Sequence, residues 1–288
     1  MKPFISGLFL GVIFLCTSVP RGDAMDIPDE YHIGGFATGC QAYTFRAFSA
    51  LEAIEKTAEA GGRIIEFYPG QRFSPEKPDL QWDHHASAEM IAQVEEHLER
   101  FDVLAVNYGV VGIPRDEEEA RKVFEFAKRL GLRGITTASV DSIDTIERLV
   151  EEYDVKVAYH NHPRRPGYDL WDPEFLKELL EGRDERIGAC ADTGHWIRSG
   201  LDPVESLRTL EGRIISLHLK DRADPDEHDV VLGTGMGKVG EILEELRRQK
   251  FSGHISVEYE HNWENSVPDV AQSIGFIRGY GVARGWGD

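Results

Sequence analysis

Residues 187–195, IGACADTGH, and residues 214–221, IISLHLKD, carry the alternating pattern from which the fold is predicted. In both runs apolar residues occupy every second position, and they share one face because successive side chains of a β-strand point to opposite faces. The other face is small or polar and carries Asp192 in the first run and His218 in the second. Each strand therefore presents a polar group on the face away from its apolar side chains.

Two further runs are built in the same way. They are VKVAYHNH at residues 155–162, with His160, and HISVEYE at residues 254–260, with Glu258. One histidine or carboxylate per strand, each at the carboxyl end, is the arrangement of a metal site at the mouth of a (β/α)8 barrel. The chain is therefore an enzyme candidate. The apolar positions of the four runs are Val155, Val157, Tyr159, Ile187, Ala189, Ala191, Ile215, Leu217, Leu219, Ile255, Val257 and Tyr259.

Strand and helix patterns alternate over residues 35–288, which predicts an α/β fold with a parallel sheet and crossover helices. Strands are expected at residues 37–43, 63–68, 102–107, 134–139, 156–161, 187–192, 214–220 and 255–260. Helices are expected at residues 51–60, 88–100, 116–130, 141–153, 174–180, 203–210, 239–249 and 267–278. Eight strand–helix pairs predict one domain, a single (β/α)8 TIM barrel. The long polar loop at residues 69–87 is expected to cover the site.

The charge balance restricts the partners. The chain has 288 residues, 41% of them hydrophobic, and a formal net charge of −19. A surface this acidic repels phosphate backbones, which argues against nucleic acid as a partner. This charge suits a small-molecule substrate such as a sugar or keto-sugar. It is also compatible with assembly of the protein into a homo-oligomer.

The first 24 residues differ from the rest. A basic start is followed by an apolar run from Phe4 to Cys16, which is typical of a secretory signal peptide, with cleavage expected near Ala24. The protein is therefore expected to be exported, periplasmic or secreted, and free of the membrane after cleavage. Cys40 and Cys190 lie on strands that are not expected to be neighbours, so both are predicted to be free thiols.

Asp192, His218 and Glu258 are ligand types that suit a divalent metal ion such as Mn²⁺, Mg²⁺, Co²⁺ or Zn²⁺. A polar residue at the end of a strand can instead simply face solvent. The shared inward face of all four residues, His160 included, favours the metal site over that alternative.

Six motifs along the chain resemble the xylose isomerase-like TIM-barrel family of sugar phosphate isomerases and epimerases, which includes an apurinic endonuclease branch. In that family, a Glu, an Asp, a His and a Glu on strands five to eight usually hold the metal. Asp192, His218 and Glu258 match this pattern, whereas His160 stands where the first Glu is expected. His160 is therefore either a ligand or a neighbour of the metal, and His162 is a further candidate for a metal ligand. The motifs are CQAYTFR (residues 40–46), IIEFYPG (64–70), YHNHP (159–163), ADTGHW (191–196), HLKDR (218–222) and VEYE (257–260).

The family's epimerases use the two metal-bound glutamates as an acid–base pair, and of these only Glu258 is present here. A histidine can act as a base near neutral pH, so His160 is a second catalytic candidate. Glu66 is a third, as an inward-facing acid–base or substrate-binding group, with burial beside an arginine as the alternative.

Several polar residues are candidates for substrate binding. The resemblance implies that His195 contacts a substrate oxygen, although it can also cap the following segment. Lys220 can bind a substrate oxygen or pair with Asp221 or Glu258. The amides and the phenol of the remaining candidates suit sugar hydroxyl groups, with barrel packing as the alternative. These are Gln41, Tyr43 and Asn107.

These features predict a metal-dependent sugar isomerase or epimerase that removes a proton next to a carbonyl through an enediolate. If a leaving group stands on the next carbon, the same enolate makes the protein a lyase or hydratase acting on keto-glycosides. An apurinic endonuclease-type hydrolase and a non-catalytic sugar-binding barrel are less favoured alternatives. The acidic charge and the expected export argue against the endonuclease.

Overall fold

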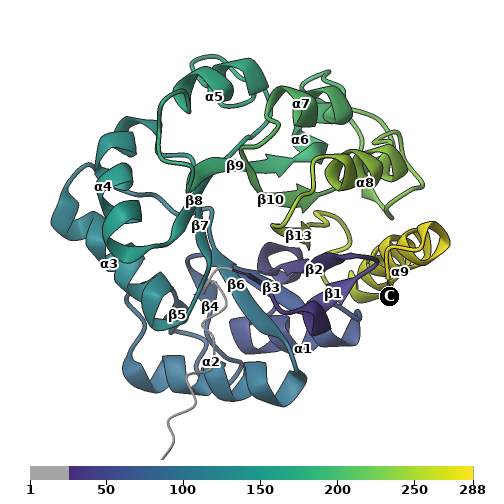
Figure 1. Cartoon of the computed structure of the whole chain (residues 1–288). Coiled ribbons are helices and arrows are strands. Elements are labelled where there is room, and N and C mark those ends of the chain that lie inside the picture. The colour runs from purple at the N-terminus through teal and green to yellow at the C-terminus, as the bar shows by residue number, and fades with distance from the viewer. Residues whose placement is uncertain (1–25, 288) are drawn as a thin grey trace, which may run out of the picture.

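The computed structural model describes residues 26–287, so the expected signal peptide at residues 1–24 lies outside the described part. Eight parallel strands close into a barrel because the last of them pairs with the first (Figure 1). The (β/α)8 fold predicted from the alternating patterns is confirmed. The barrel strands are β2 (Phe36–Gln41), β3 (Ile64–Phe67), β6 (Leu104–Tyr108), β7 (Gly134–Thr137), β8 (Lys156–His160), β9 (Ile187–Asp192), β10 (Ile214–Leu219) and β13 (His254–Val257).

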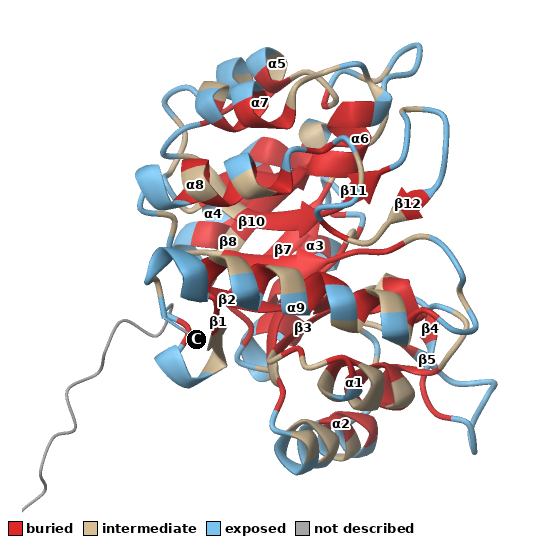
Figure 2. Ribbon diagram, turned by 90° about the vertical axis from the view of Figure 1, so that its right-hand side faces the viewer, coloured by how far each residue is buried: buried red, intermediate tan, exposed pale blue. Residues whose placement is uncertain are grey.

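A ring of helices covers the outside of the barrel, with their exposed faces outward and their buried faces on the strands (Figure 2). Within residues 26–287, none of the helices has the length and apolarity needed to cross a membrane. The helices are α1 (Ala50–Glu59), α2 (Ala88–Phe101), α3 (Glu117–Arg129), α4 (Ile143–Tyr153), α5 (Pro173–Leu179), α6 (Thr193–Arg198), α7 (Pro203–Thr209), α8 (Val239–Arg248) and α9 (Val267–Arg284).

The alternation along each strand divides the barrel into two cores. Odd-numbered side chains of β8, β9 and β10, such as Val157 and Leu217, belong to the large core beneath the helices. A small separate cluster of Ile27, Ala37, Ile64 and Val106 fills the barrel interior. The even-numbered polar residues of β8, β9 and β10 face the same interior, nearer the carboxyl ends of the strands.

Two local features differ from the expected pattern. The short helix α6 begins immediately after β9, where a loop was predicted. The predicted covering loop contains the hairpin β4 (Gln71–Arg72) and β5 (Gln81–Trp82). Trp82 is buried and its ring packs edge-on against Phe67 and Phe126, so the hairpin is held against the core. The hairpin part of this loop is therefore anchored on the core, while Pro69 at the start of the loop lines the cavity at the carboxyl ends of the strands.

A buried carboxylate joins two of the outer helices. The Glu245 side chain on α8 is 3% exposed and accepts hydrogen bonds from Arg248 and from Arg208 of α7. These hydrogen bonds, with Arg248 the strongest influence, hold the pKa of Glu245 at about 2, below the usual 4.5. A carboxyl group with a lowered pKa stabilises the fold above its unfolded pKa, and this contribution is lost as the pH falls toward the folded value.

Replacing Glu245 by glutamine is therefore expected to lower the melting temperature at pH 7. The difference from the unmodified protein should shrink as the pH falls from about 4.5 toward about 2. Thermal unfolding followed by circular dichroism across this range measures it. Glu241→Gln, an exposed carboxylate on the same helix, is the control. A constant difference at every pH would contradict the assignment.

Candidate active site

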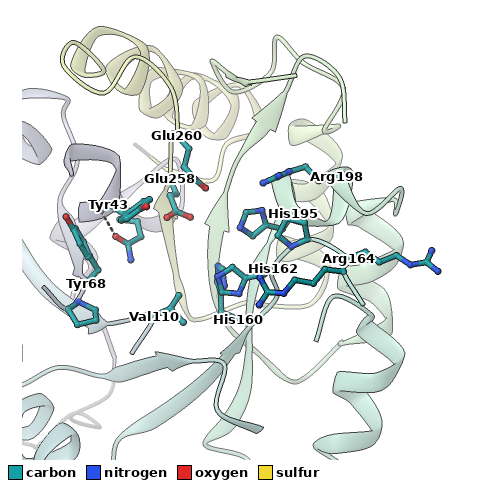
Figure 3. Close-up of a pocket in the computed structure, with 14 residues that line it drawn as sticks. Tyr43, Tyr68, Val110, His160, His162, Arg164, His195, Arg198, Glu258 and Glu260 are labelled. Carbon is teal, nitrogen blue, oxygen red and sulfur yellow. Dashed lines mark hydrogen bonds between the residues drawn. The ribbon is translucent and has the colours of Figure 1, made fainter. Parts of the chain in front are cut away.

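A cavity of about 730 Å³ opens at the carboxyl ends of the strands, a size typical of small-molecule sites. Figure 3 shows Tyr43 and Tyr68 on one side of it, and histidines and arginines on the other. The two tyrosine rings pack edge to face, with centroids 5.1 Å apart. The lining residues are Gln41, Tyr43, Tyr68, Pro69, Val110, His160, His162, Pro163, Arg164, Arg165, His195, Arg198, Glu258 and Glu260.

Four polar side chains from neighbouring strands meet at the base of this cavity. His160, Asp192, His218 and Glu258 each offer a ligand atom, and these atoms all lie within 4.8 Å of one another. They come from β8, β9 and β10 and from the residue after β13, and all four are buried. The convergence predicted from the strand pattern is therefore present in the fold.

Asp192 divides its two oxygens between helix α6 and this cluster. Its Oδ1 accepts a hydrogen bond from the backbone N–H of His195 at 2.7 Å, which caps the helix. Its Oδ2 lies 3.4 Å from His160 Nε2. Among residues 26–287, neither ring nitrogen of His160 has a hydrogen-bond partner, and Asp192 Oδ2 has an ion-pair contact with Lys220 Nζ at 3.1 Å but no hydrogen bond. Buried polar atoms normally have partners, so the cluster has the donor set and the unsatisfied atoms that suit a divalent cation.

Glu66 fixes the orientation of His218 from below. The Oε2 atom of Glu66 lies 3.0 Å from His218 Nε2, while His218 Nδ1 lies 3.2 Å from Glu258 Oε2. The other Glu66 oxygen accepts hydrogen bonds from Asn107 Nδ2 and Thr136 Oγ1. A carboxylate behind a histidine is a common way to orient a metal ligand.

This network changes the roles expected for two predicted site residues. Of the described residues, neither Glu66 nor Asn107 lines the cavity, and both are almost fully buried. Glu66 is surrounded by histidines, an amide and hydroxyl groups, not by the arginine considered from the sequence. Both residues lie behind the cluster, where they support His218.

Lys220 bridges the carboxylates of the cluster. Its Nζ lies 3.1 Å from Asp192 Oδ2 and 2.8 Å from Glu258 Oε2, and it also pairs with Glu260. The ion pair with Glu258, one of the two alternatives drawn from the sequence, is therefore present. Asp221 instead accepts hydrogen bonds from backbone N–H groups of the glycine-rich loop at residues 233–237.

The environment sets the charge states of the two candidate bases that line the cavity, Glu258 and His160. Burial raises the pKa of Glu258, but the charges of Lys220 and His218 outweigh it and hold that pKa well below its usual range. Burial, assisted by the charge of His218, holds the pKa of His160 well below its usual range. Near neutral pH the cavity therefore contains a carboxylate anion and an uncharged imidazole, both able to accept a proton.

Two further histidines, His162 after β8 and His195 in α6, form one wall of the cavity. The rings of His162 and His195 stack with centroids 5.5 Å apart, and His162 Nδ1 lies 3.1 Å from the Tyr168 hydroxyl. Burial, followed by the charge of His160, lowers the pKa of His162 to about 3, so this ring is uncharged near neutral pH. Both histidines line the cavity, as expected for groups that meet substrate oxygens.

Of the remaining predicted binders, Gln41 and Tyr43 line the cavity. The Gln41 amide is already used within the barrel, because Nε2 donates to the Gly109 carbonyl and Oε1 accepts from the Tyr43 N–H. The Tyr43 hydroxyl accepts a hydrogen bond from Arg46. Tyr43 therefore has a hydroxyl at the rim, whereas Gln41 mainly shapes the wall.

The sequence prediction missed three arginines on the cavity wall. Arg164 and Arg165 lie in the loop after β8, and Arg198 ends α6. Within the described part of the chain, none of the three forms an ion pair with a carboxylate. Arg164 and Arg165 instead lie over the rings of Trp171 and Tyr168. Two adjacent arginines in the loop after a strand that carries a site residue were the available signal.

Comparisons with known proteins place this geometry in a family. Inosose dehydratase of Clostridium beijerinckii is 29% identical over 114 residues, which are 39% of this chain and 32% of that protein. An uncharacterized protein of Parabacteroides distasonis ATCC 8503 has a solved structure that is 31% identical, with a TM-score of 0.69 over 84% of this chain and 98% of that one. The structure of a D-tagatose 3-epimerase-like protein is 21% identical, with a TM-score of 0.67 over 84% and 96% of the two chains.

The alignments with the curated relatives span less than half of those proteins' length. The family model, in contrast, matches residues 54–280, which include every barrel strand except β2. The chain belongs to the xylose isomerase-like TIM barrel family.

Proposed function

We propose that this protein is an enzyme that removes a proton from the carbon next to a carbonyl group of a sugar or cyclic polyol ketone. The observation that carries the proposal is the buried group of His160, Asp192, His218 and Glu258 at the base of the cavity. The family includes sugar isomerases and epimerases, and a dehydratase of a cyclic ketone is among its curated relatives here.

The donor atoms of the cluster fit a divalent cation, which would be held by His160, Asp192, His218 and Glu258. When bound, such a cation polarises the substrate carbonyl and the adjacent hydroxyl and so acidifies the hydrogen between them. Glu66 holds the His218 ring in place for this task, and the Asp192 backbone is fixed by Asn161, which exchanges two hydrogen bonds with it.

Proton transfer is assigned to the two bases that line the cavity. Glu258, an anion beside Lys220, takes the proton from the substrate carbon. His160, an uncharged base on the other side of Asp192 and His218, takes up a proton from solvent and gives it to the carbon from a different direction, while Glu258 releases its own proton to solvent. Removal from one face and return to the other inverts the carbon, which is an epimerisation, and return to the neighbouring carbon is an isomerisation.

A lyase or dehydratase outcome is the second candidate. Two observations favour it: His160 stands where the family's two-carboxylate pair has its first Glu, and one of the curated relatives is named inosose dehydratase. In this case Glu258 removes the same proton, and the electron pair left on the carbon expels a hydroxyl or glycosyl group from the next carbon. The proton taken by Glu258 can pass to the departing oxygen, and a ring N–H of His160, which lines the cavity, can donate a hydrogen bond to it.

One experiment separates these outcomes. The protein, loaded with Mn²⁺ or Co²⁺, is incubated in D2O with ketoses, inososes and 3-keto-glycosides, and the products are followed by NMR. An epimerase or isomerase incorporates deuterium at one carbon and yields a stereoisomer or aldose, whereas a lyase releases water or an alcohol. Glu258→Gln is expected to lower the exchange rate by about 10² to 10⁴. Absence of exchange with every substrate of the panel would reject the proposal.

A further inference from the structure

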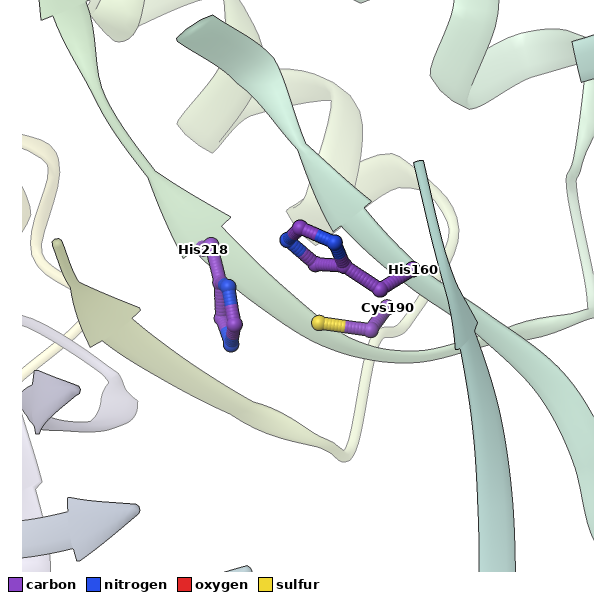
Figure 4. A group of neighbouring side chains, drawn as sticks. All are labelled: His160, Cys190 and His218. Carbon is purple, nitrogen blue, oxygen red and sulfur yellow. The ribbon is translucent and has the colours of Figure 1, made fainter. Parts of the chain in front are cut away.

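A buried thiol faces the same cluster from beneath. Cys190 precedes Asp192 by two residues on β9, so both side chains point into the barrel. The ligand atoms of His160, Cys190 and His218 lie within 4.8 Å of one another. Figure 4 shows the three side chains directed toward a common point from three adjacent strands.

The surroundings of Cys190 differ from those of an ordinary core cysteine. Cys40 is equally buried, and it packs within the large apolar core beneath the helices. Cys190 is fully buried, yet it belongs to neither apolar cluster, and its neighbours on the partner strands are Ser216 and His160. Buried cysteines usually behave as small apolar residues, so a thiol placed among imidazoles calls for another explanation.

The ring nitrogens of His160 and His218 can serve as ligands for a cation. Both ring nitrogens of His160 are buried without a hydrogen-bond partner among the described residues. The Nδ1 atom of His218 lies 3.2 Å from Glu258 Oε2, one of the oxygens of the outer donor set. The remaining nitrogen of His218 is held by Glu66, so that Nδ1 is left facing the cluster. Two imidazoles and one thiol are a common set of zinc ligands, with a fourth position for a water molecule or another ligand.

We propose that His160, Cys190 and His218 form an inner binding position for a thiophilic divalent cation such as Zn²⁺. This inner position lies beneath the outer position formed with Asp192 and Glu258. The two positions share both imidazoles, so one cation occupies one of them at a time. The inference rests on the metal centre of the proposed function and adds a choice between two donor sets within it.

Ligand chemistry decides which ion takes which position. A thiolate prefers Zn²⁺ and Co²⁺ over Mn²⁺ and Mg²⁺, whereas carboxylate oxygens suit the latter ions. On binding, the sulfur forms a bond to the cation and the thiol proton is released to solvent. A Zn²⁺ ion at the inner position also draws His160 and His218 away from the carboxylates that line the cavity. The identity of the ion thereby controls whether the outer donor set is complete.

Co²⁺ is the probe that tests this position, because a thiolate bound to Co²⁺ produces a charge-transfer absorption in the near ultraviolet. The full-length protein with Co²⁺ is expected to show this band, and Cys190→Ala is expected to abolish it. Cys40→Ala is the matched control and should retain the band. Zn²⁺ affinity, measured by competition with a chelating dye, should fall by at least about tenfold in Cys190→Ala.

X-ray absorption at the zinc edge of the unsubstituted protein gives a second measurement, independent of any effect of the substitution on folding. A sulfur atom in the first coordination shell supports the inner position. Stoichiometric Co²⁺ binding without the charge-transfer band, or a zinc shell of only nitrogen and oxygen, overturns this inference and leaves the proposed function standing. Failure of the protein to bind either ion overturns both.

Discussion

Asp192→Asn is expected to lose most of the bound divalent metal while keeping its fold. The amide oxygen can still accept the hydrogen bond from His195 that caps α6, so the change removes mainly the negative charge at Oδ2. A cation bound to the outer donor set then loses one of its two carboxylates. Metal content after loading with Mn²⁺ and desalting, measured by mass spectrometry, should fall to a small fraction of the unmodified value.

The alanine variants extend this experiment. Asp192→Ala and His218→Ala remove a ligand outright and are expected to abolish metal binding. His218→Ala also removes the imidazole 3.0 Å from the buried Glu66 carboxylate and leaves it only neutral amide and hydroxyl donors and His254, so the stability of this variant should fall. Circular dichroism separates loss of metal from loss of fold, and Asp141→Ala, which changes an exposed acid that does not line the cavity, is the control. Unchanged metal stoichiometry in Asp192→Ala and His218→Ala would refute the ligand assignment.

Lys220→Met is expected to destabilise the metal-free protein by about 3–5 kcal/mol. The ammonium group of Lys220 is almost fully buried and contacts Asp192, Glu258 and Glu260, and its removal leaves three carboxylates close together. Urea unfolding of the chelator-treated protein measures this loss. Lys238→Met, which removes an exposed ion pair with Asp202, should have little effect.

The same variant should respond more strongly to metal than the unmodified protein does. In the unmodified protein the Lys220 ammonium competes with a cation for Asp192 Oδ2 and Glu258 Oε2. Displacing the ammonium therefore lowers the net free energy gained when the cation binds. Without Lys220, a divalent cation takes over the neutralising role and recovers much of the lost stability by mass action. An equal rise in melting temperature for both proteins on adding Mn²⁺ would contradict this competition.

The barrel and the principal cluster were predictable because both depend on local alternation. A period of two along each strand determines which residues face inward, and in a closed parallel barrel the carboxyl ends of all strands meet. The site residues at the ends of these strands therefore converge independently of the loop conformations. They are His160, Asp192, His218 and Glu258. The free state of Cys40 and Cys190 was confirmed for a similar reason, since β13 and β10 stand between their strands.

The supporting network was not predictable from one sequence. Glu66 meets His218 and Ser256, which are 152 and 190 residues away in the chain, only because the barrel closes. Helix α6 was missed because six residues are too few to show a helical period, although Asp192 and the N–H of His195 supply its cap. The hairpin in the loop at residues 69–87 was missed because its two strands have two residues each.

The two oxygens of Asp192 have a consequence for the pocket wall. One oxygen is tied to the first turn of α6, and that helix carries His195 and Arg198 on the cavity side. This carboxylate cannot rotate freely, so little side-chain entropy remains to be lost when an ion arrives. Binding of an ion at Asp192 should also increase the local stability of the first turn of α6. Hydrogen exchange at the backbone amide of His195 is therefore expected to slow when the ion is present.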